Sequence, residues 1–217
     1  MCFMRNKEKD ELEMAERRNT ILKEGFRLFE AKGIEPTGMQ EIADACHLGI
    51  ATLYRYYKNK LELVLDIGTH QWKEYLVQVM KIRSRFNINQ MTAAQRLEFY
   101  LGFYIDLYQN HKELLRFNSN FNSYVKHEGA TAEQLKPYLK AIGSIALLFH
   151  EVYEKGKEDG TIRTDMSEEK MFASTSHIML AVAVRYSHGL LFSAENETDR
   201  TEEFNLLKNM ILKEFVI

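Results

Sequence analysis

Several features that would define other protein classes are scarce in this sequence of 217 residues. Its two cysteines, Cys2 and Cys46, are too few for a disulfide framework or a zinc site. No apolar run is long enough to cross a bilayer, and the mixed charges of residues 1–16 leave no apolar core for a signal peptide. We therefore expect a cytoplasmic protein in a reducing compartment, with no metal, no cofactor and no membrane partner.

Catalytic motifs are absent as well. The sequence contains no G-x-S-x-G nucleophile motif, no glycine-rich phosphate loop and no H-E-x-x-H metal motif, and its seven histidines are scattered. We therefore expect no catalytic residue and no enzymatic activity. The formal net charge of −2 argues against a general polyanion binder, although specific DNA binding needs only a basic face.

Prolines are rare too, since only Pro36 and Pro137 interrupt a sequence rich in helix formers. No sustained strand alternation and no internal repeat is visible, so the sequence predicts an all-α fold. Residues 37–40, 92–95 and 131–134 each fit a capping box that opens a helix, and Pro137 suits the first turn of the next helix. The expected helices cover residues 11–32, 38–46, 50–57, 61–82, 92–109, 112–125, a stretch that opens at 131, 137–158, 168–191 and 201–215.

Residues 37–60 carry the most informative pattern, two short helices joined by a corner at His47, Leu48 and Gly49. The interval from 45 to 61 contains three basic residues and no acidic one. The spacing places Leu53 and Tyr57 on the inward face of the second helix, whose N-terminal residues would meet base edges in a major groove. The expected DNA-contacting residues are Thr37, Gln40, Gly49, Ile50, Ala51, Thr52, Tyr54, Arg55, Tyr56, Lys58 and Lys60.

The order of these residues resembles the DNA-binding domain of the tetracycline-repressor (TetR) family over about residues 17–65. The family usually has glycine, serine and glycine where this sequence has His47, Gly49 and Ala51. Histidine tolerates left-handed backbone better than most residues, so the corner should keep its shape. The matching residues are Arg18, Ile21, Leu22, Phe26, Leu28, Phe29, Gly33, Thr37, Ile42, Ala43, Thr52, Leu53, Tyr54, Tyr56, Tyr57 and Lys60.

The resemblance implies two domains and a regulatory function. Residues 1–60 would form the helix-turn-helix DNA-binding domain, and residues 61–217 a helical domain for effector binding and dimerisation, with the helix 61–82 as the link between them. The implied function is a transcriptional regulator, a repressor released from a palindromic operator by a small molecule that shifts a population of states. The alternative is a helical interaction protein that uses the helix-turn-helix only as scaffold.

The last two expected helices carry broad apolar belts. A surface helix should show one apolar stripe, so a wider belt needs burial on two sides. The resemblance implies a homodimer through a four-helix bundle, with recognition helices about 34–36 Å apart; the alternative is a helix buried within one monomer. The expected interface residues are Met171, Ile178, Met179, Val182, Tyr186, Phe204, Leu207, Met210 and Ile211.

Aromatic residues are concentrated in the middle of the chain. Together they could line an apolar pocket between helices, suited to an unknown apolar or aromatic effector. The alternative for each of them is an ordinary core position. The expected lining residues are Trp72, Tyr75, Phe99, Phe103, Tyr104, Phe117, Phe121, Tyr124, Phe149, His150 and Tyr153.

Overall fold

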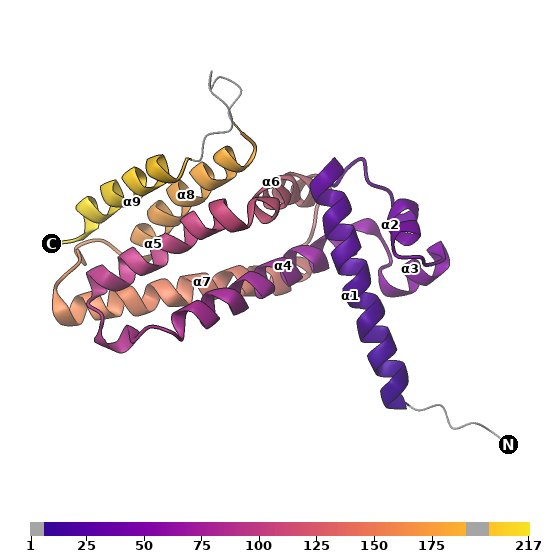
Figure 1. Ribbon diagram of the computed structural model, residues 1–217, viewed down its shortest axis with the longest axis horizontal. Helices are drawn as coiled ribbons and strands as arrows, with labels where there is room; N and C mark the ends of the chain where they lie inside the picture. Colours follow the sequence, from indigo (N-terminus) through magenta and orange to yellow (C-terminus); the bar gives the residue numbers. More distant parts are fainter. Residues whose placement is uncertain (1–6, 190–199) are drawn as a thin grey trace. The chain divides into compact units, whose positions relative to one another are not determined.

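The computed structural model describes residues 7–189 and 200–217. Most of these residues are helical, and among them the only strand-like pairing is an isolated bridge between Ile162 and Val216. The all-α prediction is therefore confirmed (Figure 1). The α-helices are α1 (Lys7–Lys32), α2 (Met39–Ala45), α3 (Ile50–Tyr56), α4 (Lys60–Arg83), α5 (Ala93–Asn110), α6 (Lys112–His127), α7 (Ala132–Asp159), α8 (Glu168–Ser187) and α9 (Thr201–Phe215), with a 3-10 turn at Ile88–Gln90. None of these helices is long and apolar enough to span a membrane.

The helices form two compact units. The first consists of Met1–Gln71 and Asn120–Tyr138, and the second of Trp72–Ser119 and Leu139–Ile217. Helices α4, α6 and α7 therefore contribute residues to both units. The domain boundary expected after residue 60 stays a prediction, because these units are defined by compactness and not by function.

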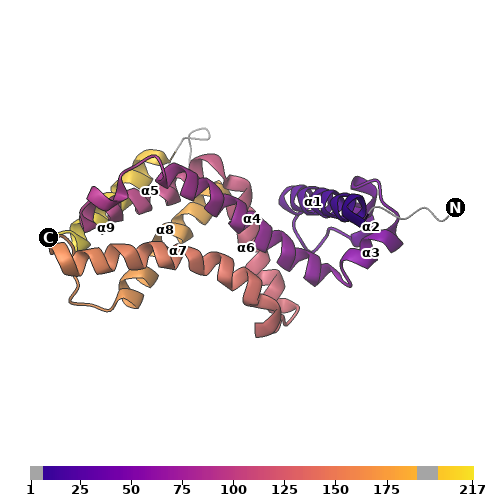
Figure 2. The same ribbon diagram turned by 90° about the horizontal axis from the view of Figure 1, so that it is seen from below.

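In the first unit, α1 packs against α2, and α2 packs against α3 (Figure 2). The apolar side chains that meet there recur at helical spacing, and Ile21, Phe29, Ile42 and Leu53 are completely buried. Close packing also depends on Gly25 of α1, where a Cβ atom would lie 2.7 Å from the Ile67 side chain of α4. The core of this unit thus holds the short α2 against α1 and the short α3 against α2.

The same unit includes the end of α6 and the start of α7. The rings of Phe121 and Tyr138 stack with their centroids 4.3 Å apart. They cover Gly68 of α4, where a Cβ would lie 2.7 Å from Phe121 and 3.2 Å from Tyr138. This glycine therefore allows α4 to approach both aromatic rings.

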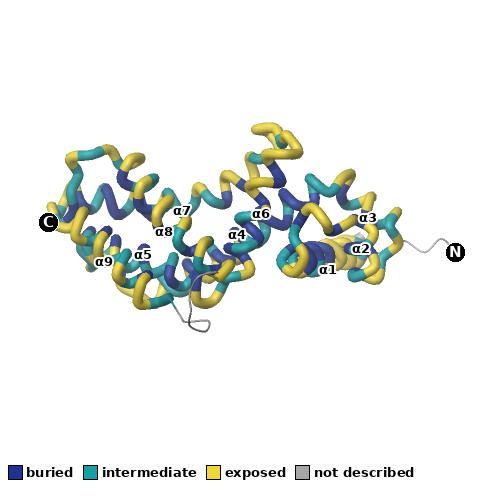
Figure 3. The backbone as a smooth tube through the Cα atoms, turned by 90° about the horizontal axis from the view of Figure 1, so that it is seen from above, coloured by how far each residue is buried: buried dark blue, intermediate teal, exposed yellow. Residues whose placement is uncertain are grey.

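In the second unit, α5 packs against α8 and α9, and α8 packs against α9. Figure 3 shows how buried and exposed positions alternate along these helices. Tyr108 of α5 stacks on Phe204 of α9 with ring centroids 5.6 Å apart. The loop after α7 is fastened to the end of α9, because Arg163 N donates to the Phe215 carbonyl at 2.7 Å.

Two of the three predicted capping boxes are confirmed. Thr92 and Gln95 exchange side-chain-to-backbone hydrogen bonds at the start of α5, and Thr131 and Gln134 do the same before α7. The box predicted for residues 37–40 is wrong, since Gly38 is the N-cap of α2 and has no side-chain capping bond.

Pro137 does not open a new helix as predicted. Helix α7 begins at Ala132 and continues through Pro137 to Asp159. The Thr131 cap starts this helix one and a half turns earlier. Proline lacks an N–H, so α7 has no backbone hydrogen bond from this position.

Candidate functional site

The corner between α2 and α3 is a Schellman motif built on a histidine. His47 has a positive φ of 55°, the left-handed conformation that glycine usually supplies. The His47 N–H donates to the Asp44 carbonyl at 3.0 Å, and the Leu48 N–H donates to the Ala43 carbonyl at 2.9 Å. The expectation that the corner keeps its shape with histidine is confirmed.

Helix α3 presents one buried and one exposed face. Leu53 and the C-cap residue Tyr57 are buried, as their spacing predicted. Tyr54 and Arg55 are exposed, and the Arg55 Nη2 atom lies 3.5 Å from Thr52 Oγ1. Gly49 is the N-cap and has no side chain to cap the helix, so the first amides of α3 are open at the surface.

A partly exposed hydrogen-bond network fixes the C-terminal end of α3. The Tyr57 hydroxyl donates to Asp66 Oδ2 on α4 at 2.6 Å. Arg18 of α1 binds the same carboxylate, with Nη2 to Oδ2 at 2.8 Å and Nε to Oδ2 at 3.1 Å. Burial raises the pKa of Tyr57, so the phenol stays a hydrogen-bond donor. These three side chains tie α1, α3 and α4 together behind the exposed face of α3.

Two of the predicted DNA-contacting residues, Thr37 and Lys60, instead form hydrogen bonds within the first unit. The Thr37 side chain is completely buried, and its hydroxyl donates to the Gly33 carbonyl at 2.8 Å just past the end of α1. Thr37 is therefore corrected to a structural residue. Lys60 Nζ donates to the Glu35 carbonyl at 2.8 Å and lies 5.2 Å from the centre of the Tyr124 ring. Partial burial of the ammonium lowers the pKa of Lys60.

The other predicted contacts lie at the surface of α2, α3 and the turn that follows. Gln40 is exposed, although its amide also donates to Asp44 at 2.8 Å. The Lys58 side chain is exposed, while its backbone N–H donates to Glu62 Oε2 at 2.8 Å. The exposed or half-exposed predicted residues are Gln40, Gly49, Ile50, Ala51, Thr52, Tyr54, Arg55, Tyr56 and Lys58.

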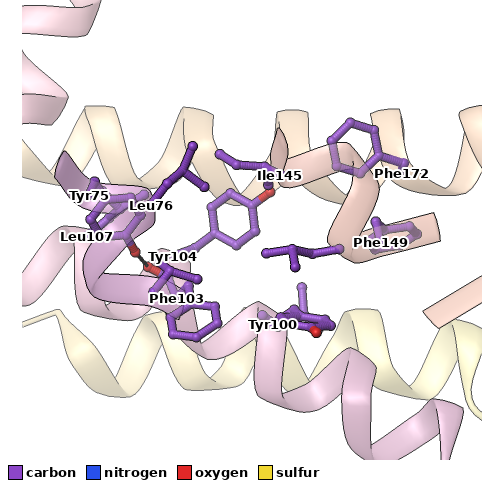
Figure 4. Close-up of a pocket in the computed structure, with 12 residues that line it drawn as sticks. Tyr75, Leu76, Tyr100, Phe103, Tyr104, Leu107, Ile145, Phe149 and Phe172 are labelled. Carbon is purple, nitrogen blue, oxygen red and sulfur yellow. Dashed lines mark hydrogen bonds between the residues drawn. The ribbon is translucent and has the colours of Figure 1, made fainter. Parts of the chain in front are cut away.

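The second unit contains an apolar pocket of about 40 Å³ among α4, α5, α7 and α8 (Figure 4). Sequence reasoning found four of its residues, Tyr75, Phe103, Tyr104 and Phe149. The lining it missed is mostly aliphatic and consists of Leu76, Val79, Tyr100, Leu101, Leu107, Ile145, Leu148 and Phe172. A search for aromatic residues could have found Tyr100 and Phe172 but not the six aliphatic residues, which only their helical spacing marks as inward-facing.

The polar atoms at this pocket are already hydrogen-bonded. The Tyr75 hydroxyl donates to the Phe103 carbonyl at 2.7 Å, as Figure 4 shows. The Tyr104 hydroxyl donates to Ser176 Oγ at 2.8 Å, and Arg83 Nε donates to the Tyr100 hydroxyl at 2.9 Å. Burial raises the pKa of Tyr75 and of Tyr104, so neither ionises near neutral pH. The pocket therefore offers an apolar surface with no charged group among its lining residues.

Seven predicted pocket residues do not line this cavity. Phe121 and Tyr124 belong to the first unit, and the exposed His150 bonds Glu168. The Tyr153 hydroxyl donates to the Met166 carbonyl at 2.5 Å, and Trp72 Nε1 donates to Asn118 at 3.4 Å. The remaining two are Phe99, which contacts Phe86 and Phe103, and the buried Phe117.

The predicted dimer residues divide between the monomer core and the surface. The side chains of Met171, Met179, Phe204 and Ile211 are buried within the chain, which corrects their assignment to an interface. Ile178 and Met210 remain exposed, at 45% and 60%, and Leu206 is a further exposed apolar residue on α9 at 62%. The partly exposed remainder is Val182, Tyr186 and Leu207.

Helix α3 follows a left-handed corner and exposes aromatic and basic side chains to solvent. This arrangement is typical of a helix-turn-helix DNA-binding protein. Residues 21–67 match the family model described as "Bacterial regulatory proteins, tetR family". These residues therefore resemble the DNA-binding domain of that family, and the comparisons support a DNA-binding transcriptional regulator.

The chain is also similar to known proteins in sequence and in fold. An HTH-type transcriptional regulator of Staphylococcus aureus is 24% identical over 174 residues, which cover 80% of this chain and 85% of the relative. A putative transcriptional regulator from Saccharomonospora viridis has the same fold, with a TM-score of 0.72 and 16% identity over 94% of this chain and 99% of that one. The fatty acid degradation regulator FadR from Bacillus halodurans superposes with a TM-score of 0.66 and 17% identity, over 90% and 94% of the two chains.

Proposed function

We propose that this regulator is a homodimeric repressor that leaves a palindromic operator when an apolar small molecule occupies the pocket among α4, α5, α7 and α8. The observation that carries the proposal is that pocket, a cavity with an apolar lining in the unit that does not contain α3. Pockets between helices, lined by apolar groups with a few fixed polar atoms, are typical small-molecule sites.

The pocket chemistry favours an apolar or aromatic effector. Its three tyrosine hydroxyls are committed to protein partners, so an effector that needs many hydrogen bonds would leave them unpaired or break them. The cavity of about 40 Å³ has room for roughly three water molecules. An effector larger than that must displace side chains, and displacement of lining side chains is how its binding would favour a different state.

The exposed face of α3 would read the operator. Thr52 and Arg55 can bond base edges, and the rings of Tyr54 and Tyr56 can contact bases or sugars. Lys58 would bind a phosphate, because its side chain is exposed and its ammonium is a compact charge. Ile50 and Ala51 offer no hydrogen bonds, so readout at the start of α3 would depend on contact with thymine methyl groups.

Helix α4 would carry the signal. It begins directly after the turn that follows α3, and its residues Tyr75, Leu76 and Val79 line the pocket. A shift of α4 on effector binding would therefore change the position of α3. Such coupling requires the effector to bind one state more tightly than the other.

Small-molecule control has support from a protein of the same fold. The similar regulator from Saccharomonospora viridis was solved in complex with choline. The fold thus accommodates a small ligand in at least one protein, while the lining described above argues for a less polar effector in this chain.

The proposal is tested by filling the pocket. Val79→Phe places a larger side chain into the cavity, whereas Val77→Phe, two residues away on α4, adds the same side chain at an exposed position. A panel of small aliphatic and aromatic compounds is scored by loss of operator binding in fluorescence anisotropy. We expect wild type and Val77→Phe to respond to the same compounds and Val79→Phe to lose the response.

The rival function is a helical interaction protein that keeps the helix-turn-helix as scaffold. It predicts that neither variant nor wild type binds any duplex more tightly than random DNA. An unchanged response of Val79→Phe to an active compound would instead place the effector site elsewhere.

A further inference from the structure

Three potential metal ligands meet where α7 faces the first turn of α8. They are His150 and Glu154 on α7 and Glu168 on α8, and one donor atom from each lies within 4.8 Å of the other two. The His150 Nδ1 atom is 2.9 Å from Glu168 Oε2. All three side chains reach solvent, so an ion could enter without opening the core. Nothing in the sequence motifs brings these residues together, because Glu168 is separated from His150 by a helix end and a loop.

The backbone holds this arrangement in place. His150 and Glu154 are four residues apart on one helix, so their side chains share a face, the spacing that metal-binding helices use. Glu168 is the first residue of α8, after the N-cap Ser167 whose side chain accepts from the Lys170 N–H. A carboxylate is favoured there by the helix dipole, and its hydrogen bond to His150 holds it beside α7.

The surroundings already attract positive charge. Lys157 Nζ lies 2.6 Å from Glu154 Oε1 and 5.3 Å from the centre of the Tyr153 ring. His150 is hydrogen-bonded to Glu168, and the Lys157 ammonium donates to Glu154. Both pairs are exposed ion pairs that contribute little to stability, so a metal ion could replace the ammonium and the imidazole proton at small cost.

The donor set selects the class of ion. One imidazole nitrogen and two carboxylates suit first-row transition metals such as Zn²⁺, whereas Mg²⁺ and Ca²⁺ prefer oxygen donors alone. Tetrahedral Zn²⁺ with ligands at about 2.0–2.1 Å needs donor atoms about 3.3 Å apart. The donor atoms now lie within 4.8 Å of one another, so binding would require the glutamate side chains to move closer to the imidazole.

We propose that His150, Glu154 and Glu168 form a site for a divalent transition-metal ion that fastens α7 to the start of α8. Water would fill the remaining coordination positions, as in other three-ligand zinc sites. The site is separate from the apolar pocket and does not depend on the proposed effector.

The ion would act on the pocket wall through its neighbours. Phe149 precedes His150, and Phe172 lies one helical turn after Glu168. Their rings are in contact, with centroids 5.3 Å apart, and both line the pocket. A metal that joins His150 to Glu168 would therefore hold these two rings together and reduce the opening of the pocket on this side.

The test is metal binding by the full-length protein without a histidine tag. Isothermal titration with Zn²⁺ should show one ion per chain, and Co²⁺ should give a visible absorption band of a nitrogen- and oxygen-ligated ion. His150→Ala and Glu168→Gln should each weaken Zn²⁺ binding by at least about tenfold. Zn²⁺ should also raise the melting temperature of wild type but not of these two variants.

Matched controls separate this site from general surface binding. His177→Ala removes another exposed histidine, on α8, and Glu158→Gln removes an exposed carboxylate near the end of α7. Both should bind Zn²⁺ like wild type. The proposal is overturned if wild type takes up no Zn²⁺ at a large molar excess, or if His150→Ala and Glu168→Gln retain wild-type affinity.

Discussion

His47 has a backbone conformation that is unusual for a residue other than glycine. It occupies the left-handed position that ends α2, and both backbone bonds of the Schellman motif depend on that conformation. The sequence allowed this to be predicted, because histidine is among the residues that tolerate positive φ. The geometry of the corner therefore depends on backbone conformation and not on any side-chain cap.

We predict that the free energy of unfolding depends on how well the residue at position 47 tolerates a positive φ. His47→Gly should raise the free energy of unfolding by about 0.5 kcal/mol, since relief of the left-handed strain outweighs the entropy cost of glycine. His47→Val should lower it by about 1–2 kcal/mol, because a β-branched residue resists positive φ. Urea denaturation measures both. Equal stability of the valine and glycine variants would show that the corner is not strained.

Arg55 is the second informative residue. Within the described part of the chain, Arg55 makes one hydrogen bond, the long one to Thr52 Oγ1, so it contributes little to the stability of α3. We predict that Arg55→Ala raises the Kd for operator DNA by about 10- to 100-fold and leaves the melting temperature unchanged. Fluorescence anisotropy and thermal denaturation provide the two readouts.

Arg85→Ala is the control for Arg55→Ala, because Arg85 is an exposed arginine in the second unit. It should leave both DNA affinity and melting temperature unchanged. A large loss of stability in Arg55→Ala, with DNA affinity reduced only in proportion, would mean that Arg55 is a structural residue.

At the scale of the element, α4 depends on a glycine that faces two aromatic rings. Gly68→Ala would place a methyl group against Phe121 and Tyr138. Overpacking of this kind costs about 1–3 kcal/mol, which exceeds the gain of up to about 1 kcal/mol in helix propensity. We predict a net loss of about 1–2 kcal/mol in the free energy of unfolding, measured by urea denaturation.

Two further variants check the cause. Gly143→Ala in α7 has no atom within 4 Å of the new methyl group, so it should be neutral or stabilising. Phe121→Leu should recover part of the loss when it is combined with Gly68→Ala. A Gly68→Ala variant as stable as Gly143→Ala would contradict the close packing of α4 against α6.

Rules that use only neighbouring residues predicted where helices begin. They did not predict which side chains line the pocket and which belong to the ordinary core. The caps at Thr92 and Thr131 need only residues near in sequence, and both are present. Thr37 differs because its hydroxyl reaches back to the Gly33 carbonyl, an acceptor that the end of α1 leaves available. The aliphatic pocket residues Ile145 and Leu148 could not be assigned, since their spacing fits a pocket wall and an ordinary core equally well.

At the scale of the whole molecule, dimerisation needs an apolar face that the monomer does not already bury. Ile178 of α8 and Leu206 and Met210 of α9 are exposed, although Met171 and Met179 of α8 are core residues. Apolar periodicity revealed the belt but not which side of it faces the rest of the chain. The assignment of the exposed side to a second copy stays a prediction.

We predict that the double variant Ile178→Asp, Met210→Asp converts the dimer to a monomer in sedimentation equilibrium and abolishes tight operator binding, because two half-sites must be bound together. The control variant Val77→Asp, Leu147→Asp changes two apolar residues that are also exposed, on α4 and α7. It should remain dimeric. A wild-type protein that is monomeric at all concentrations would contradict this prediction.

The most direct test of the central claim is selection of duplexes bound by the wild-type protein from a random DNA pool at low salt. We predict enrichment of an inverted repeat whose half-sites are about one helical turn, or 34–36 Å, apart. The same selection with Arg55→Ala should give weaker enrichment. A pool that remains random after repeated rounds would contradict the conclusion that this chain is a sequence-specific DNA-binding regulator.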